Sequence, residues 1–243
     1  MYLSVIIPAH NEEKRIVRTL EANAAYLRAK NFDYEVIVVN NGSTDATEHI
    51  VRDFAKSAPF VKIFNTNGKG KGFAVRYGMM HSTGDIRLFM DADNATTLDH
   101  FNLMEPLFRQ GCDLVYGTRD SRDLKEARQV ISQPWYRRLL GDIGNLIIQA
   151  LVLPGIWDTQ AGFKACTKKA AEDIFSRGII DGFGFDIEML SLAKHLRFRL
   201  GKIPLQWEND PDSKVGTGAY IQVFKEVFQV RWNLWTDVYG IRK

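Results

Sequence analysis

Two aspartates stand one residue apart at the end of an apolar run, and their type and spacing suit metal binding. The run Leu88–Met90 is followed by Asp91 and Asp93. In an open α/β sheet, ligands bind at the carboxyl ends of the strands, so a buried strand here would carry both carboxylates to a crevice. Hard divalent cations are commonly held by one or two carboxylates together with substrate phosphates. The alternative is an acidic turn leading into the next helix, with Thr96 or Thr97 as its N-cap.

A glycine-rich stretch, Gly68-Lys-Gly-Lys-Gly72, could approach a phosphate group. Glycines let the backbone come close to a ligand, and Lys69 and Lys71 would supply cationic hydrogen-bond donors. The stretch is not a Walker loop, because no Lys-Ser or Lys-Thr follows its glycines, and it is not a dinucleotide fingerprint after a first strand. A solvated flexible loop is the alternative interpretation.

Polar turns also follow two other predicted strands. They are Pro8-Ala-His-Asn-Glu12 and Val39-Asn-Asn-Gly-Ser43. Both would lie at the same sheet edge as Asp91, so three polar turns converge on one crevice. Ordinary turn and capping chemistry is the alternative, and for residues 43–45 we expect it to hold as well.

Single charged residues later in the chain could meet phosphates or an acceptor. Arg119 follows another predicted strand, where its guanidinium could clamp a phosphate, and Arg137 and Arg138 could do the same from the following helix. Asp158 and Asp186 are candidates for the acceptor side. The alternatives are a solvated charged face for the arginines and a helix cap for Asp186.

Strands and helices are predicted to alternate through the first half of the chain. Continuous apolar runs indicate buried strands, and apolar residues three or four positions apart indicate helices. This alternation favours right-handed crossovers and a mostly parallel sheet. The expected strands are 3–7, 34–39, 61–65, 86–90 and 113–117, and the expected helices are 12–28, one starting at Asp45, 73–81 and 98–110.

After Arg119 the pattern changes. Residues 120–138 are rich in charge and are expected to form a mobile loop leading into a helix. Short elements follow from Trp157, including a helix at 168–175 and another opening at 182–188. We expect a domain at 1–218, with a nucleotide-binding half (1–119) and an acceptor-binding half (120–218). Aromatic residues near helical spacing then predict an amphipathic helix within 219–243.

Composition indicates a globular α/β protein. With 243 residues, 45% of them hydrophobic, the chain can bury a sizeable core, and two small domains are also compatible with this length. The net charge of +3 is too small for a nucleic-acid-binding protein, but a mildly basic surface favours phosphate-bearing ligands or an anionic membrane. Cys112 and Cys166 lack metal-type spacing, so we expect free buried thiols in a reducing compartment.

Neither a signal peptide nor a membrane-spanning helix is predicted. The N-terminus lacks a basic segment and a long apolar core, so it is expected to be the first strand. The longest apolar stretch elsewhere, Leu146–Leu153, is far shorter than the roughly 20 residues that a bilayer span needs.

Eight ordered motifs resemble those of glycosyltransferase family 2 enzymes with the GT-A fold. The last three narrow the resemblance to the dolichyl- or polyprenyl-phosphate sugar synthases, with the dolichyl-phosphate beta-glucosyltransferase branch nearest. The motifs span most of the chain and lie at residues 4–12, 38–43, 71–76, 90–93, 117–119, 158–164, 185–188 and 212–214.

The resemblance implies inverting transfer of glucose from UDP-glucose to a polyprenyl (dolichyl-type) phosphate, with Mg²⁺ or Mn²⁺ as cofactor. It also implies a Rossmann-like, mostly parallel sheet flanked by helices. An acceptor that is already a phosphate is ionised at neutral pH, so positioning and charge compensation would be the main catalytic tasks.

Site residues follow from the resemblance by position. Asp91 would contact the ribose or the metal, and Asp93 would ligate the metal; with Arg119 and Asp158 they form the expected catalytic set. The nucleotide sugar would also be framed by Pro8, Ala9, His10, Glu12, Val39, Asn41, Lys71 and Ala92. Phosphate or acceptor contacts would come from Arg119, Arg137, Lys164, Asp186 and Lys214.

Three sites depart from the family's usual pattern. Asn40 and Asn41 stand where acids are usual, so a base or ribose contact would come from an amide, with altered affinity or base choice. His10 replaces the usual Tyr, which could stack similarly and add pH dependence. Ala95 stands where related mannose-transferring enzymes often carry Gln, so one contact around the metal would be missing.

A lipid-linked acceptor has to be reached at a membrane. We expect Leu146–Leu153 and the aromatic C-terminal helix to rest on the membrane surface, which makes the protein peripheral on the cytoplasmic face; the alternative is that both pack on the core. No nucleic acid is expected as a partner, and the oligomeric state stays open. Two other functions remain compatible: a family 2 transferase using GDP-mannose or a soluble acceptor, and a sugar-nucleotide-binding protein without turnover.

Overall fold

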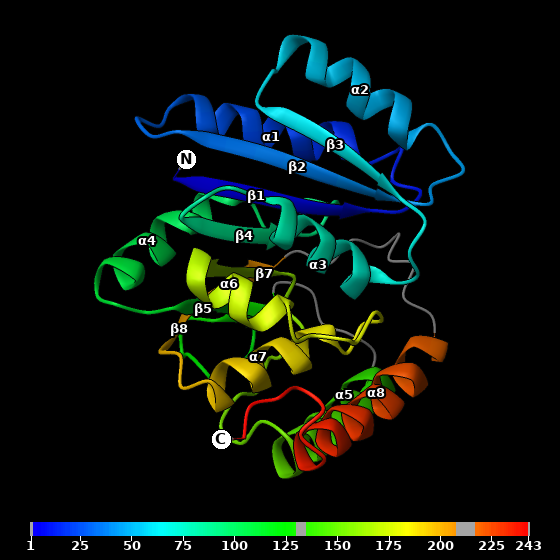
Figure 1. Ribbon diagram of the computed structural model, residues 1–243, viewed down its shortest axis with the longest axis vertical. Coiled ribbons are helices and arrows are strands. Elements are labelled where there is room, and N and C mark those ends of the chain that lie inside the picture. Colours follow the sequence, from blue (N-terminus) through cyan, green and yellow to red (C-terminus); the bar gives the residue numbers. More distant parts are fainter. Residues whose placement is uncertain (1, 130–134, 208–216, 243) are drawn as a thin grey trace.

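A seven-stranded sheet forms the centre of the protein. The computed structural model describes residues 2–129, 135–207 and 217–242, and its main sheet has the strand order β3-β2-β1-β4-β7-β5-β8 (Figure 1). A separate parallel pair joins β6 (Arg128–Gln129) to β9 (Gln206–Trp207). The strands of the main sheet are β1 (Leu3–Ala9), β2 (Tyr34–Asn41), β3 (Val61–Thr66), β4 (Ile86–Met90), β5 (Leu114–Thr118), β7 (Phe163–Thr167) and β8 (Leu200–Pro204).

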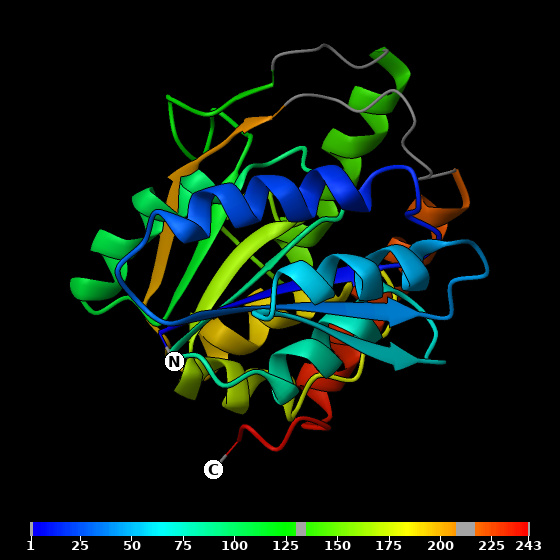
Figure 2. The ribbon, with the colours of Figure 1, turned by 90° about the horizontal axis from the view of Figure 1, so that it is seen from above.

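Helices cover both faces of this sheet and bury two apolar cores (Figure 2). Successive side chains of a strand point to opposite faces, so Ile6 packs in one core while Val5 and Ile7 pack in the other. One face is covered by α1 (Ile16–Arg28), α2 (Thr47–Ser57) and α4 (Phe101–Arg109). The 3₁₀ turn η1 (Leu98–His100) comes directly before α4. The other face is covered by α3 (Lys71–His81), α5 (Trp135–Leu151), α6 (Lys168–Phe175), α7 (Phe185–His195) and α8 (Thr217–Trp235).

Strand β7 is the one strand of the main sheet that pairs antiparallel to its neighbours, and the sequence did not predict it. It lies between β4 and β5, with Met90 opposite Phe163. Because β7 runs in the opposite direction, its beginning lies at the edge where the parallel strands end. The loop 158–162 is thereby brought to the same edge as Asp91 and Arg119.

The predicted fold class is confirmed, with shifts at element boundaries. Helix α1 begins at Ile16, four residues later than expected, because Glu12–Arg15 form a turn in which the Glu12 carbonyl accepts the Arg15 and Ile16 N–H groups. Strand β2 continues to Asn41 because Asn41 pairs with Thr66 of β3. Both cysteines are free and buried, as predicted.

Helix α8 carries apolar side chains on its exposed face as well as on its buried one. Val227, Val230 and Leu234 pack in the core shared with α7, whereas Trp232 and Trp235 are 57% and 60% exposed. The helix lies beside α5 at one end of the molecule (Figure 1). In the described part of the chain, no helix has the length and apolar character needed to cross a membrane.

Candidate active site

The turn after β4 holds Asp91 and Asp93 in fixed positions at the carboxyl edge of the sheet. Thr19 of α1 donates a hydrogen bond to the Ala92 carbonyl at 2.6 Å. Asp93 Oδ1 accepts the Ala95 N–H at 3.0 Å, which is an Asx turn. The turn interpretation of this motif is therefore correct for Asp93, and it is compatible with a ligand role because the second carboxylate oxygen is not used in that bond.

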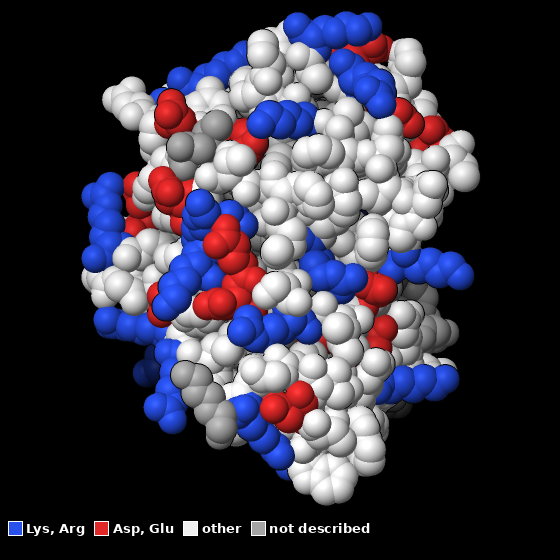
Figure 3. Space-filling model, viewed as in Figure 1, with Lys and Arg blue, Asp and Glu red and all other residues white. Residues whose placement is uncertain are grey.

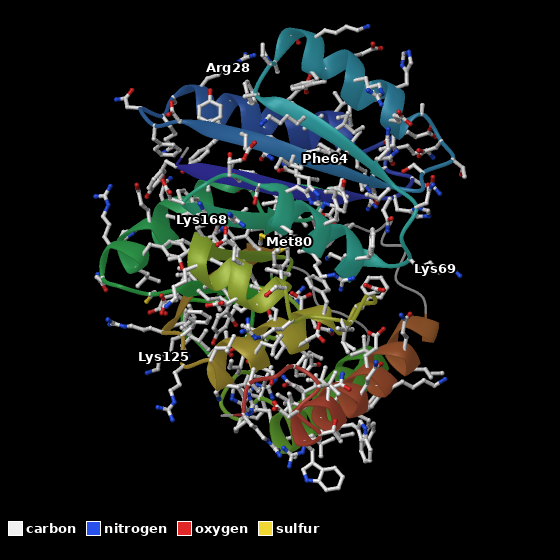
Figure 4. All side chains as sticks on the ribbon, in the orientation of Figure 1. Arg28, Phe64, Lys69, Met80, Lys125 and Lys168 are labelled. Atoms are coloured by element: carbon white, nitrogen blue, oxygen red, sulfur yellow. The ribbon has the colours of Figure 1, made fainter. Side chains whose placement is uncertain are left out.

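Lys71 pairs with Asp91 at the start of α3. Burial alone would lower the pKa of the Lys71 ammonium, but the charges of Asp91 and Asp186 raise it above its ordinary value, so the cation is retained. Lys69, two residues earlier, points away from the molecule (Figure 4). The two lysines of the glycine-rich stretch thus differ, and only Lys71 belongs to the cluster of charges around Asp91.

The glycines of this stretch allow close packing against the protein's own backbone. A Cβ atom on Gly70, whose φ is +91°, would overlap the Asp181 carbonyl, and one on Gly72 would overlap the Ile180 carbonyl. The Phe73 N–H also donates to the Asp181 carbonyl at 3.2 Å. Residues 178–184, called the bracing loop below, therefore hold the turn that carries Lys71.

Arg119 and Asp158 form a bidentate ion pair at the end of β5. The guanidinium Nε and Nη2 lie 2.8 and 2.9 Å from the Asp158 carboxylate oxygens, and the Arg119 backbone N–H donates to the same group at 2.8 Å. Burial would raise the pKa of the Asp158 carboxyl, but the Arg119 charge and hydrogen bonds bring it below its ordinary value. Asp158 therefore holds the Arg119 guanidinium in place.

Asp123 supports this pair, a role that was not predicted, because in the sequence Asp123 is one acid in a charge-rich stretch. Its buried carboxylate accepts hydrogen bonds from the Thr118 hydroxyl and from the backbone N–H groups of Trp157 and Asp158, at 2.9–3.1 Å. It thereby joins the end of β5 to the loop that carries Asp158. Part of the stretch expected to be a mobile loop is thus an ordered support for the site.

Lys164 and Asp186 form a second buried pair beneath the crevice. Lys164 Nζ lies 2.5 Å from Asp186 Oδ1 and 2.6 Å from the Ala161 carbonyl, and its side chain is fully buried. Burial raises the pKa of the Asp186 carboxyl, although the Lys164 charge opposes this. In this conformation the Lys164 side chain is not accessible to a phosphate. It instead holds Asp186 and the loop before β7 in place through these two contacts.

The charges of the cluster suit a divalent cation. It contains three cations and four carboxylates, and burial, followed by the Asp91 charge, raises the pKa of Asp93. A bound Mg²⁺ or Mn²⁺ would relieve this repulsion, and hard oxygen ligands are the donors such ions prefer. Across residues 2–129, 135–207 and 217–242, no group of three or more His, Cys, Asp or Glu side chains could hold a metal unaided. Asp91 and Asp93 would thus supply part of the shell, and ligand phosphates or water would supply the rest.

Gly162 meets Asp91 across the junction of β4 and β7. A Cβ atom on Gly162 would overlap the Asp91 carboxylate, so only glycine leaves room for that side chain in its present position. The residue lies inside the 158–164 motif, but its role was not predicted, because the contact depends on the antiparallel strand. A small cleft here is lined by Asp91, Asp93, Ala95, Thr96, Arg119, Ala161, Gly162 and Leu205.

The predicted nucleotide residues at the ends of β1 and β2 lie at the same carboxyl edge of the sheet, and His10 and Asn41 among them contact each other. His10 is exposed, and its Nδ1 lies 2.8 Å from the Asn41 carbonyl. The Asn41 amide donates to the Gly70 carbonyl at 3.0 Å, and its oxygen accepts the Thr66 hydroxyl at 2.9 Å. The Asn40 amide donates to the Asn65 side chain at 2.9 Å, and among the described residues its own buried side-chain oxygen has no partner.

The remaining predicted residues differ in what they can present to a ligand. Glu12 binds Arg15 through two oxygens at 2.7 and 2.8 Å. The Val39 side chain is fully buried, and Ala9 is 3% exposed, so backbone atoms would make any contact there; Pro8 is half-buried. The Arg137 side chain and the whole of Lys214 lie outside the described residues.

Comparison with known proteins agrees with this geometry. The model of the glycosyl transferase family 2 matches residues 4–175. The chain is 31% identical to dolichyl-phosphate beta-glucosyltransferase ALG5D of Trichomonas vaginalis, over 97% of this chain and 76% of that protein. It is 30% identical to dolichyl-phosphate beta-glucosyltransferase of Homo sapiens, over 99% of this chain and 78% of that protein.

Solved structures show the same fold. Glucosyl-3-phosphoglycerate synthase of Mycobacterium tuberculosis superposes with a TM-score of 0.68 at 19% identity, covering 95% of this chain and 81% of that one. The same enzyme with Mn²⁺, UDP-glucose and phosphoglyceric acid superposes with a TM-score of 0.68 at 20% identity, covering 95% and 80%. The chain therefore belongs to glycosyl transferase family 2 and is a glycosyltransferase with the GT-A fold.

Proposed function

We propose that the protein transfers glucose from UDP-glucose, with inversion, to the phosphate of a dolichyl-type polyprenyl carrier, assisted by Mg²⁺ or Mn²⁺. The observation that carries the proposal is the cluster of Asp91, Asp93 and Arg119 at the carboxyl edge of the sheet. This cluster occurs in a chain that is about 30% identical to dolichyl-phosphate beta-glucosyltransferases from several organisms.

The cluster suits the meeting of two anions. Asp93, with Asp91, would hold the divalent cation, which supplies positive charge opposite the departing diphosphate. Arg119, held by Asp158, and Lys71 would add hydrogen bonds to phosphate oxygens. Because the acceptor phosphate is ionised at neutral pH, no strong general base is required, and the protein's main task is to bring the two anions together.

A panel of nucleotide sugars, tested with one polyprenyl phosphate, checks this proposal. We expect radiolabelled glucose from UDP-glucose to enter the lipid fraction only with Mg²⁺ or Mn²⁺ present, and mannose from GDP-mannose to enter far less. Transfer from GDP-mannose, or to a soluble acceptor alone, would replace this proposal with another family 2 activity. Calorimetric binding of UDP without transfer to any acceptor would leave a binding protein without turnover.

We further propose that α8 rests on the cytoplasmic face of an anionic membrane. The polyprenyl-phosphate acceptor lies in this membrane. Ile221, Phe228, Trp232 and Trp235 follow one another at helical spacing and are 56–62% exposed. The exposed charges of the same helix, Lys225 and Arg231, are basic, and Glu226 is buried. Figure 3 shows a largely uncharged lower end of the molecule, bordered by Lys and Arg side chains and by some Asp or Glu side chains.

Vesicle flotation tests the surface without removing the helix, whose other face belongs to the core. We expect Trp232→Gln with Trp235→Gln to abolish flotation with vesicles containing anionic phospholipid, while the melting temperature stays unchanged. Leu103→Gln is the matched control, because Leu103 is 49% exposed on α4, on the other face of the sheet. Equal flotation of the double variant and the wild type would remove this part of the proposal.

A further inference from the structure

Helix α8 touches the bracing loop, residues 178–184, through a buried carboxylate that the function above does not use. Glu226 Oε2 accepts the Gly184 N–H at 2.6 Å, and Oε1 accepts the Gln222 amide at 2.9 Å. A Cβ atom on Gly182 or Gly184 would overlap Glu226. The carboxylate therefore lies directly against the backbone of the loop, with no room between them.

Gly184 is the N-cap of α7, and its N–H is among the groups that a helix leaves without a partner at its N-terminus. A carboxylate at this position satisfies that N–H and is favoured by the helix dipole. Asp186 lies two residues further on, in the first turn of the same helix. The contact made by Glu226 thus fixes the end of α7 from which Asp186 extends to Lys164.

A second contact from the C-terminal segment reaches the same loop. Tyr239 donates to Glu188 Oε1 at 2.8 Å, and the Glu188 carboxylate accepts the N–H groups of Ile179 and Ile180 at 3.0–3.2 Å. Both ends of the bracing loop are therefore held by residues of the C-terminal segment, one directly and one through Glu188. On its other side the loop packs against Gly70 and Gly72, beside Lys71.

We propose that Glu226 is a positioning residue that links α8 to the acceptor side of the reaction centre. The inference rests on the proposed function, in which α8 meets the lipid surface. Through Gly184 and α7, the carboxylate sets the position of Asp186, and through the bracing loop it supports the turn that carries Lys71. The helix that would meet the lipid and the turn whose Lys71 would contact phosphate are then joined by one series of buried contacts.

The test compares Glu226→Ala and Glu226→Gln with Gln229→Ala, an exposed residue of the same helix, as control. For Glu226→Ala we expect kcat for transfer to polyprenyl phosphate to fall about tenfold, because small misplacements of positioned groups slow transfer strongly. The affinity for UDP should fall less than kcat, because Lys71 rests on the bracing loop, whereas His10 and Asn41 are also held by contacts at the ends of β1 and β2. Glu226→Gln should restore most of kcat, because its amide oxygen can still accept the Gly184 N–H if Gln222 reorients.

Hydrogen exchange supplies a readout that does not depend on activity. We expect Glu226→Ala to speed exchange at the amides of residues 179–188 and to leave the strands of the sheet unaffected. Unchanged exchange in 179–188, or parallel losses of kcat, UDP affinity and melting temperature, would overturn the positioning role. If the wild type transfers nothing to polyprenyl phosphate, the proposed function fails, and the exchange comparison still decides whether Glu226 holds α7.

Discussion

Charged groups are buried at both ends of the central sheet, but their surroundings differ. At the amino end, the Glu35 carboxylate accepts hydrogen bonds from Ser4, Lys62 and both the backbone and the hydroxyl of Thr83, at 2.6–2.8 Å. Burial alone would raise the pKa of Glu35, but these donors lower it to about 2. At the carboxyl end, the pKa of Asp158 is lowered by Arg119, but those of Asp93 and Asp186 are raised.

The difference separates a structural network from a binding site. In the Glu35 network the hydrogen-bond donors already stabilise the ionised carboxylate. A cationic ligand would therefore add little stabilisation there. The cluster around Asp91 contains more carboxylates than cations and opens into a cleft, so it favours a ligand that brings positive charge. Loss of a residue should therefore reduce activity at the carboxyl end, whereas at the amino end it should reduce stability alone.

Asp93→Asn gives the largest effect expected of this comparison. Transfer should fall about 10²-fold or more, because the preferred ligand of the cation is lost. The melting temperature without metal should stay equal or rise, since a raised pKa means that the ionised Asp93 is less favourable in the folded than in the unfolded chain. Asp53→Asn, in the ion pair with Lys56 on α2, is the control. Full transfer by Asp93→Asn would contradict the metal role.

Arg119→Gln should weaken UDP binding about tenfold, as expected for the loss of a charge-assisted phosphate contact. It should also destabilise the fold by about 3–5 kcal/mol, because the Asp158 carboxylate stays buried without its partner. The double variant Arg119→Gln with Asp158→Asn separates the two effects. It should regain stability in urea unfolding and keep the weak UDP binding seen by calorimetry. Recovery of UDP affinity in the double variant would show that Arg119 serves the fold alone.

Gly162→Ala tests the contact between β7 and Asp91. The added methyl group must displace the Asp91 carboxylate, so we expect transfer to fall about tenfold through misplacement of that group. Gly141→Ala in α5 is a matched control, since a Cβ atom there meets no atom of the described residues within 4 Å. Equal transfer by Gly162→Ala and the wild type would mean that the Asp91 position is not critical.

The parallel part of the sheet could be predicted because buried parallel strands are continuous apolar runs. The strands ending at Ala9, Asn41 and Met90 each carry a polar turn, and the rule that ligands bind at that edge placed Asp91 and Asp93 correctly at the end of β4. Arg119 was expected at a strand end and Asp158 on the acceptor side, and the resemblance to family 2 placed both in the catalytic set; the structure brings them together as an ion pair.

Strand β7 and its consequences were not predictable from periodicity. The run Phe163–Thr167 contains Lys164, and a lysine in a central strand disagrees with the apolar pattern unless its carboxylate partner is known. That partner, Asp186, lies on a helix 22 residues later. The roles of Asp123 and Glu226 were also missed, because their partners are again distant in the sequence. Both carboxylates accept backbone N–H groups of other segments.

Glu35→Gln is expected to have the smallest effect on the active site and a clear effect on stability. Because its pKa is about 2 in the folded chain against an ordinary value of 4.5, the ionised Glu35 contributes about 3 kcal/mol to stability at neutral pH. A lowered pKa means that this contribution is complete above about pH 4.5 and is lost as the pH falls toward 2. The difference in unfolding free energy between wild type and Glu35→Gln should thus shrink from pH 6 to pH 3 in urea titrations, with Glu21→Gln, exposed on α1, as the control. Transfer at pH 7 should be unchanged, and a loss of UDP affinity in Glu35→Gln would show that the two ends of the sheet are coupled and not separate in function.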